Sequence, residues 1–130
     1  MDFASKPLPE DHDVIAPDGS EVRILLSARG GSMAHFRLQA GHVSAAVRHR
    51  SVDEIWYVLD GYGEMWRRTG SMENVVALGP HLSLTIPVGT SFQFRAGHDA
   101  PLSVLGITMP PWPGPEEAEA VEGHWRPTSP

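Results

Sequence analysis

The chain has 130 residues, 41% of them hydrophobic, which is enough apolar material for the core of one domain, and a second domain is not expected. It contains no cysteine, which excludes disulfides, thiolate zinc sites and a cysteine nucleophile. The formal net charge is -6 at pH 7. The sequence contains no basic stripe and no arginine cluster, so nucleic-acid binding is not expected.

The acidic residues are concentrated at the two ends of the chain. Residues 1–20 carry a net charge of -4 and residues 109–130 carry -3, which leaves the middle at +1. We expect both acidic segments to stay solvated. The first residues lack the basic segment and apolar run of a signal peptide, and no stretch approaches the roughly 20 apolar residues of a membrane helix. The sequence therefore predicts a cytoplasmic protein with no membrane partner.

Residues 1–20 contain three prolines and the turn pair Asp18-Gly19, which predict an extended or poorly ordered N-terminal arm. From Glu21 onward, short runs of β-branched, aromatic and aliphatic residues recur about every ten residues between glycines and prolines. This pattern is typical of an antiparallel sandwich or barrel, which we expect over residues 21–108. We predict strands at 21–27, 32–38, 43–49, 54–60, 63–69, 74–78, 82–86, 91–95 and 102–108.

The clearest predicted element is a hairpin over residues 54–66, in which two β-rich runs are joined by a segment with two glycines. Side chains alternate between the faces of a strand, so Glu54, Trp56 and Val58 are expected on one face. By the same rule, Val47 and His49 share one face of the preceding strand.

Residues 109–130 form a proline-rich C-terminal tail. Proline removes a ladder donor and fixes φ, so the run that starts at Pro110 is expected to leave the sheet and cross the surface as an extended strap. Large apolar rings are seldom left exposed to solvent, so Trp112 and Trp125 are expected to pack against the barrel.

The segment from Gly41 to Gly61 resembles the first motif of the cupin superfamily, which reads Gly, five residues, His-x-His, three or four residues, Glu, six residues, Gly. Gly41, His49, Glu54 and Gly61 fall on this motif at the right spacing. Val47 occupies the position of the first histidine.

Residues 86–94 look like the second cupin motif, Pro-x-Gly-x-x-His. Pro87 and Gly89 match it, and Phe92 holds the position of the histidine. The opening glycine is displaced, since Gly79 lies two residues too early, and Ala96 stands where an asparagine normally ends the motif. The resemblance implies an all-β, double-stranded β-helix barrel of the jelly-roll type with extended arms, and a homodimer.

In cupins the motif histidines and the glutamate hold one divalent metal inside the barrel, and here only His49 and Glu54 remain of that set. Imidazole and carboxylate suit Zn, Fe, Ni or Mn, but a catalytic metal generally needs about three protein ligands. A metal at this place would therefore require another inward side chain, such as His35, His42 or His81.

Without a metal, His49 and Glu54 can still act as a general acid and base, because imidazole exchanges protons near neutral pH and a nearby carboxylate stabilises its charged form. Such a pair could support isomerisation, epimerisation or dehydration. Alternatively, the barrel has lost its catalytic activity and the two groups serve only as polar partners for each other, since a buried carboxylate needs a partner in any case.

Alternation also predicts an apolar cavity around the pair, which would suit a small organic molecule with a flat part. Its inward side chains are Val47, Trp56, Val58, Phe92 and Phe94. Val58 and Phe94 are expected to fill the core, whereas Trp56, Phe92 and Val47 are candidates for contact with a ligand.

Three hypotheses follow for the function of the chain. The leading one is a small cupin that binds a small molecule and performs acid/base chemistry with His49 and Glu54, with or without a metal. The second is a non-catalytic ligand-binding or accessory cupin. The third is a divalent-metal oxygenase or isomerase with an atypical ligand set.

Overall fold

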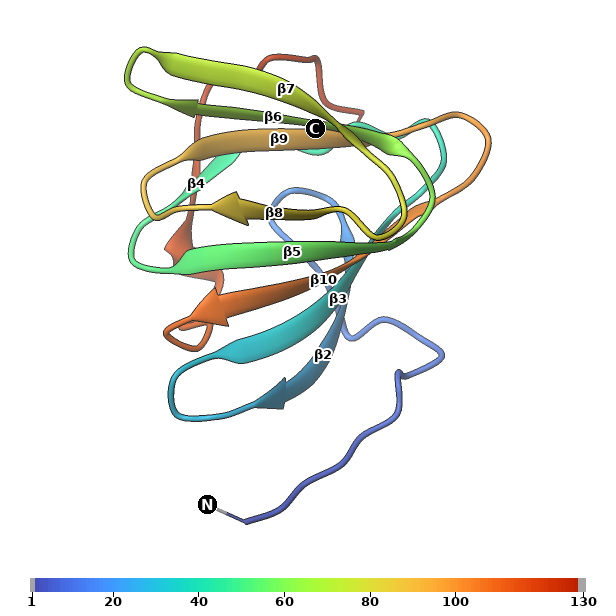
Figure 1. Ribbon diagram of the computed structural model, residues 1–130, viewed down its shortest axis with the longest axis vertical. Coiled ribbons are helices and arrows are strands. Elements are labelled where there is room, and N and C mark those ends of the chain that lie inside the picture. Colours follow the sequence, from blue (N-terminus) through green and yellow to red (C-terminus); the bar gives the residue numbers. More distant parts are fainter. Residues whose placement is uncertain (1, 129–130) are drawn as a thin grey trace.

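The computed structural model describes residues 2–128 as two antiparallel sheets packed face to face (Figure 1). The six-stranded sheet contains, in spatial order, β1 (Val14–Ile15), β2 (Glu21–Ser27), β3 (Ser32–Leu38), β10 (Leu102–Met109), β5 (Asp53–Asp60) and β8 (Ser83–Ile86). The five-stranded sheet contains β11 (Ala118–Ala120), β4 (Val47–His49), β9 (Ser91–Ala96), β6 (Gly63–Thr69) and β7 (Met72–Leu78). None of the described residues forms a helix that could span a bilayer.

All nine predicted strands are present, and most of their ends agree within two residues. The largest difference is in the strand predicted at 43–49, which begins only at Val47, because the chain before it turns and makes a single bridge from Val43 to Arg95. The structure adds two short strands in the arms, β1 and β11. The second of these corrects the expectation for the tail, which rejoins the sheet along β4 after a short 3-10 turn, η1 (Pro115–Glu117).

The core lies between the two sheets and is built from the inward residues of each strand, as the alternation of side chains requires. Trp56 is its largest fully buried side chain, stacked on Phe36 at 6.0 Å between ring centroids and in edge contact with Phe94 at 4.9 Å. Val58 and Phe94 are core residues, as predicted. The fold thus fills the space between its sheets with aromatic and aliphatic side chains.

Gly61 closes the turn between β5 and β6 with a φ of 85°, a conformation that L side chains rarely adopt. A Cβ at this position would also collide with the carbonyl oxygen of Pro101. The glycine that ends the first motif is therefore required by backbone geometry rather than by chemistry.

We predict that Gly61→Ala lowers the free energy of unfolding by about 3 kcal/mol or more, because it combines a strained φ with a backbone collision. The matched control is Gly70→Ala, where φ is 58° but no atom lies within 4 Å of the added Cβ. It should cost only about 1 kcal/mol. Urea unfolding of both variants measures the difference, and equal losses would contradict the role given to Pro101.

The C-terminal tail is held by Gln93, whose side chain is completely buried on the outer side of β9. Its amide nitrogen donates to the carbonyl oxygens of Ser44 and Trp125, both at 2.8 Å. Its amide oxygen accepts from the backbone N–H groups of His124 and Trp125, also at 2.8 Å. The Trp125 ring lies 4.3 Å from the guanidinium carbon of Arg95. Gln93 therefore fixes His124 and Trp125 of the tail against the sheet.

Candidate active site

His49 and Glu54 lie together between the sheets, as the motif spacing predicts. His49 ends β4 and Glu54 is the second residue of β5, so the short loop between them brings both side chains to the same end of the barrel. Their side chains are only 6% and 3% exposed, and His49 Nδ1 is 3.4 Å from Glu54 Oε1. The alignment is not that of a hydrogen bond, and His49 Nδ1 has no hydrogen-bond partner among residues 2–128.

The second carboxyl oxygen of Glu54 is fixed by its neighbours. Trp56 Nε1 donates to Glu54 Oε2 at 2.7 Å. On the adjacent strand β10, Gly106 leaves room for the carboxyl group, since a Cβ there would come within 2.6 Å of Oε2. One oxygen of Glu54 is thus held in place, while the other faces the imidazole of His49.

Burial governs the protonation of both groups. Desolvation raises the pKa of Glu54 to about 8, a shift that the hydrogen bond from Trp56 opposes and the charge of Asp18 reinforces. Desolvation also lowers the pKa of His49, against the attraction of the Glu117 carboxylate. Near neutral pH the two groups are therefore a carboxylic acid beside a neutral imidazole. The expectation that the carboxylate would stabilise a charged imidazolium is wrong for this arrangement.

Apolar side chains enclose the pair where the cupin motifs place histidines. Val47 and Phe92 are opposite each other on β4 and β9, and both are less than 5% exposed. Phe92 meets the His49 ring at 5.1 Å between centroids, and Trp112 of the tail meets it at 5.2 Å, each in an edge contact. As predicted, Trp112 packs against the barrel, and it covers the pair from the outside.

The predicted ligand-contacting residues Trp56, Phe92 and Val47 are all packed in the core cluster. Trp56 donates to Glu54 and the Phe92 ring meets that of His49, so these two side chains lie against the acid/base pair in a filled part of the core. Trp112 is 38% exposed, and its backbone N–H donates to Ser32 Oγ at 2.9 Å. A ligand that reaches His49 from this side must therefore displace the Trp112 ring.

Glu117 is a buried carboxylate that the sequence analysis missed. We expected the acidic tail to be solvated, but Glu117 is only 5% exposed and accepts hydrogen bonds from Ser51 N and Oγ, both at 2.6 Å, and from Val52 N at 2.9 Å. Burial opposes ionisation of this group, but these hydrogen bonds outweigh it, so the pKa of Glu117 is lowered. The interaction joins the tail to the loop between His49 and Glu54.

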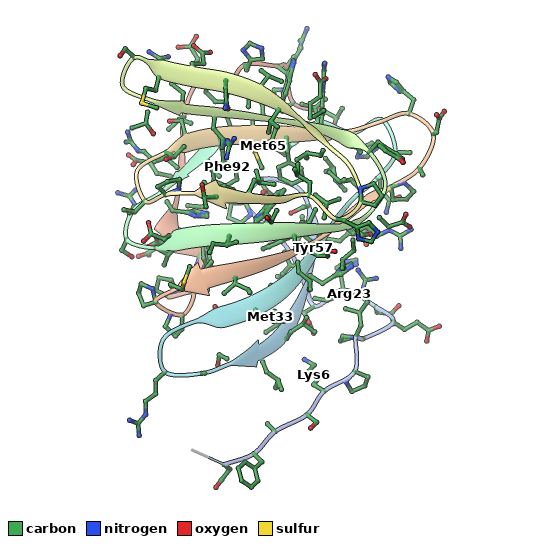
Figure 2. The ribbon with its side chains drawn as sticks, in the orientation of Figure 1. Lys6, Arg23, Met33, Tyr57, Met65 and Phe92 are labelled. Carbon is green, nitrogen blue, oxygen red and sulfur yellow. The ribbon has the colours of Figure 1, made fainter. Side chains whose placement is uncertain are left out.

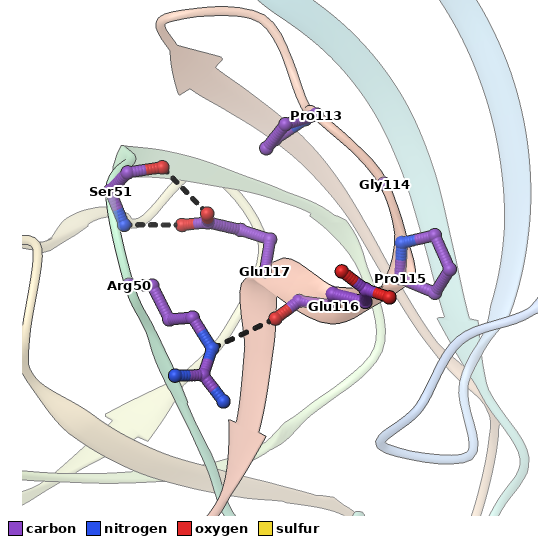
Figure 3. A pocket seen from close by; sticks show the side chains of 7 residues that line it. All are labelled: Arg50, Ser51, Pro113, Gly114, Pro115, Glu116 and Glu117. Atoms are coloured by element: carbon purple, nitrogen blue, oxygen red, sulfur yellow. Dashed lines mark hydrogen bonds between the residues drawn. The ribbon is translucent and has the colours of Figure 1, made fainter.

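A surface pocket of about 380 Å³ lies beside this contact (Figure 3). Its lining combines the loop after β4 with the strap of the tail, as Figure 3 shows for Arg50, whose Nε donates to the carbonyl oxygen of Glu116. The pocket is therefore bounded by the same segments that cover the acid/base pair.

Asp18 is a second group that sequence reasoning missed, because its pairing with Gly19 suggested only a turn. Ser20 donates to Asp18 Oδ1 from its backbone N–H at 3.0 Å and its hydroxyl at 2.7 Å, and the Asp18 carbonyl accepts from Ala45 N at 2.8 Å. Desolvation raises the pKa of Asp18 despite the hydrogen bonds from Ser20. The N-terminal arm thus contributes a carboxyl group that acts on Glu54 through its charge.

The residues around the pair do not fit a divalent metal. His35 has an outward position on β3, since the adjacent Phe36 packs on Trp56 in the core. His42 is exposed in a turn, and His81 is bonded through Nδ1 to the hydroxyl of Tyr57 at 2.8 Å. No three histidine, aspartate or glutamate side chains within residues 2–128 are grouped as metal ligands. The pair supplies two donors, fewer than a catalytic metal generally needs.

No protein-family model and no curated protein matches this sequence. Solved structures do match its fold. PAC13 from Streptomyces, crystallised with uridine, superposes with a TM-score of 0.70 at 13% identity, over 92% of this chain and 93% of that one. KdgF from Halomonas gives 0.64 at 20% identity, over 78% and 88% of the two chains.

A third similar structure is an uncharacterised Klebsiella pneumoniae protein with a double-stranded β-helix domain, which matches with a TM-score of 0.65 at 14% identity, over 91% of this chain and 90% of that one. The three matches agree with the two antiparallel sheets described above. They establish the fold class that the sequence predicts, and identities of this size establish no activity.

Proposed function

We propose that this chain, whose fold is the cupin-type double-stranded β-helix, binds a small organic molecule between its sheets and exchanges protons with it through Glu54 and His49. The observation that carries the proposal is the buried carboxylic acid of Glu54 facing a neutral imidazole at 3.4 Å. We also propose a cytoplasmic location, with which a chain that can form no disulfide agrees.

The protonation states of the pair give each residue a role. Glu54 holds a proton near neutral pH and can donate it, and His49 has a free nitrogen that can accept one. A ligand that displaces the Trp112 ring and contacts both groups would meet a proton donor and a proton acceptor that lie 3.4 Å apart. This arrangement supports isomerisation, epimerisation or dehydration next to a carbonyl group, the reactions in which a proton is removed and either returned or lost with water.

Some similar structures also support a small ligand. The Streptomyces structure contains uridine, a molecule with a flat ring and a sugar, and Trp56, Phe92 and Trp112 supply flat apolar surfaces around the pair here. CapF, a capsular polysaccharide assembling protein from Staphylococcus aureus, has been solved with an inhibitor, and this chain corresponds to 36% of its length. We use these structures only to choose the first probes, which are uridine and simple sugars that carry a carbonyl group.

The test is deuterium exchange from D₂O into carbon-bound positions of these probes, followed by proton NMR. Glu54→Gln keeps the shape of the side chain and an acceptor for Trp56 but removes the acid, so it should reduce exchange by about 100-fold or more. Glu64→Gln is the matched control, because Glu64 forms a surface ion pair with Arg95. Binding of a probe with no exchange in the wild type would instead support the non-catalytic, ligand-binding alternative.

Metal analysis separates the proposal from a metalloenzyme. The protein is purified without added metal, beside His49→Ala and the exposed control His42→Ala. We expect less than stoichiometric metal in all three, because only two donors meet at the site. Stoichiometric metal that disappears in His49→Ala and remains in His42→Ala would replace our proposal with a metal-dependent cupin enzyme.

A further inference from the structure

Three buried nitrogen atoms on the outer side of the six-stranded sheet have no hydrogen-bond partner among residues 2–128: Arg23 Nη1, His35 Nδ1 and Arg37 Nε. Arg23 is 7% exposed, His35 is 5% exposed, and Arg37 is half-buried. The one other buried side-chain atom of this kind in the described part of the chain belongs to His49 in the candidate active site. Buried polar groups are normally satisfied by protein, by water or by an ion, so three of them in one place indicate a missing partner.

The strand register explains why these side chains gather. Arg23 on β2 lies directly opposite His35 on β3, and Glu21 lies opposite Arg37 two residues along. All four side chains have outward positions, because the intervening Phe36 packs on the core and side chains alternate along a strand. Residues directly opposite each other on one face have Cβ atoms about 5 Å apart. The four residues therefore form a compact group, which we call the outer cluster.

The N-terminal arm covers one side of the outer cluster. Arg23 donates from Nε and Nη2 to the carbonyl oxygens of Pro9 and Glu10, at 2.9 and 2.8 Å. In Figure 2 the labelled Arg23 lies beside the arm, and Lys6 follows farther along it toward the N-terminus. Arg37, on the other side of the cluster, is partly exposed to solvent. A small solute can therefore reach the cluster from the side of Arg37.

The outer cluster carries more positive than negative charge. Glu21 is its one carboxylate, and Glu21 Oε1 is 3.8 Å from Arg23 Nη1. The same carboxyl group accepts a hydrogen bond from Gln39 Nε2 at 2.5 Å and lies 3.7 Å from His12 Nδ1. Arg37 forms no ion pair with any residue that the structure describes. One positive charge of the cluster is therefore left without a counter-charge.

His35 adds a hydrogen-bond donor to the cluster without adding a charge. Burial lowers the pKa of His35, and the charges of Arg23 and Arg37 lower it further, so the ring is neutral near neutral pH. A neutral imidazole can carry its proton on Nδ1 and donate from there, whereas the nitrogens of arginine can only donate. The three unpartnered atoms can therefore all donate to one acceptor.

We propose that the outer cluster binds a small oxyanion, a carboxylate or phosphate group, through Arg23 Nη1, His35 Nδ1 and Arg37 Nε. The oxygens of such a group accept several hydrogen bonds at once, and its charge balances that of Arg37. A water molecule in the same place would supply an acceptor but no charge. The cluster is on the outer side of the sheet, whereas Glu54 faces the core, so this site is separate from the proposed acid/base function.

An NMR titration of ¹⁵N-labelled protein with sodium phosphate, at constant pH and ionic strength, tests the proposal at the site itself. The ring signals of His35 should shift and reach saturation, and bound phosphate should raise the pKa of His35, because a nearby negative charge stabilises the imidazolium form. The same titration with acetate distinguishes the two classes of oxyanion. Saturation by both anions would show that a carboxylate is sufficient, and saturation by phosphate alone would identify a phosphate site.

The variant that removes the uncompensated charge is Arg37→Gln, which should raise the dissociation constant for phosphate about tenfold or more. Arg29→Gln is the matched control, because Arg29 is exposed in the turn between the same two strands, and it should bind phosphate like the wild type. Circular dichroism checks that both variants fold. Ring signals of His35 that do not respond to either anion, or equal phosphate affinity in Arg37→Gln and the wild type, would overturn the proposal.

Discussion

Glu54→Gln should lose less stability than the wild type as the pH rises from about 5 to 8. In the unfolded chain Glu54 titrates near its ordinary pKa of 4.5, whereas burial raises its pKa in the folded protein to about 8. Between these two values the unfolded state releases the proton and the folded state keeps it, so the stability of the wild type falls as the pH rises. Glutamine cannot titrate and removes this contribution.

The measurement is the free energy of unfolding in urea at several pH values, expressed as wild type minus Glu54→Gln. We expect this difference to change by several kcal/mol across the window, with the variant favoured at the alkaline end. The subtraction is needed because other groups also titrate: Asp18 has a raised pKa and acts in the same direction, while the lowered pKa of His49 acts in the opposite one. A difference that is flat with pH would show that Glu54 is ionised in the folded protein.

Removing the Glu117 carboxylate should destabilise the protein by about 3 kcal/mol, because Glu117→Ala leaves the backbone N–H groups of Ser51 and Val52 without their acceptor. The strap that carries Trp112 would also lose its attachment to the loop beside His49. We therefore expect a second effect, a Trp112 ring that is more accessible to an aqueous quencher.

Urea unfolding and acrylamide quenching of tryptophan fluorescence measure these two effects. Glu119→Ala is the matched control, since Glu119 is two residues away on the same tail and pairs with Arg48 at the surface. Exposed ion pairs contribute little, so this control should behave like the wild type. If both variants unfolded alike, the hydrogen bonds of Glu117 would not hold the strap.

Much of the barrel could be predicted because local patterns and the fold agree there. The alternation from Glu54 to Val58 placed the acid on the inner face, and the motif spacing brought His49 to it. Gly61 was recognisable for the same reason, since its turn demands a conformation that glycine adopts readily.

The remaining parts of the site depend on contacts between segments that are distant in sequence. The local sequence does not distinguish Glu117 from other acidic residues, and its burial depends on the tail crossing the loop at Ser51. In the same way, Asp18 reads as a turn residue, and its position near the site depends on the hydrogen bond from Ala45 N to its carbonyl oxygen. The protonation of His49 was also misjudged, because it depends on how deeply both groups are buried rather than on their spacing.

The hydrogen bonds between Gln93 and residues His124 and Trp125 can form only late in the synthesis of the chain. Strand β4, which carries His49, is paired on one side with β9 and on the other with β11, so it gains its second neighbour only from the last part of the chain. Synthesis proceeds from the N-terminus at about 5–20 residues per second. A nascent chain that has reached Thr108 therefore has both members of the acid/base pair but lacks β11 and the residues that Gln93 binds, and we expect its site to close only after residues 109–125 have been made.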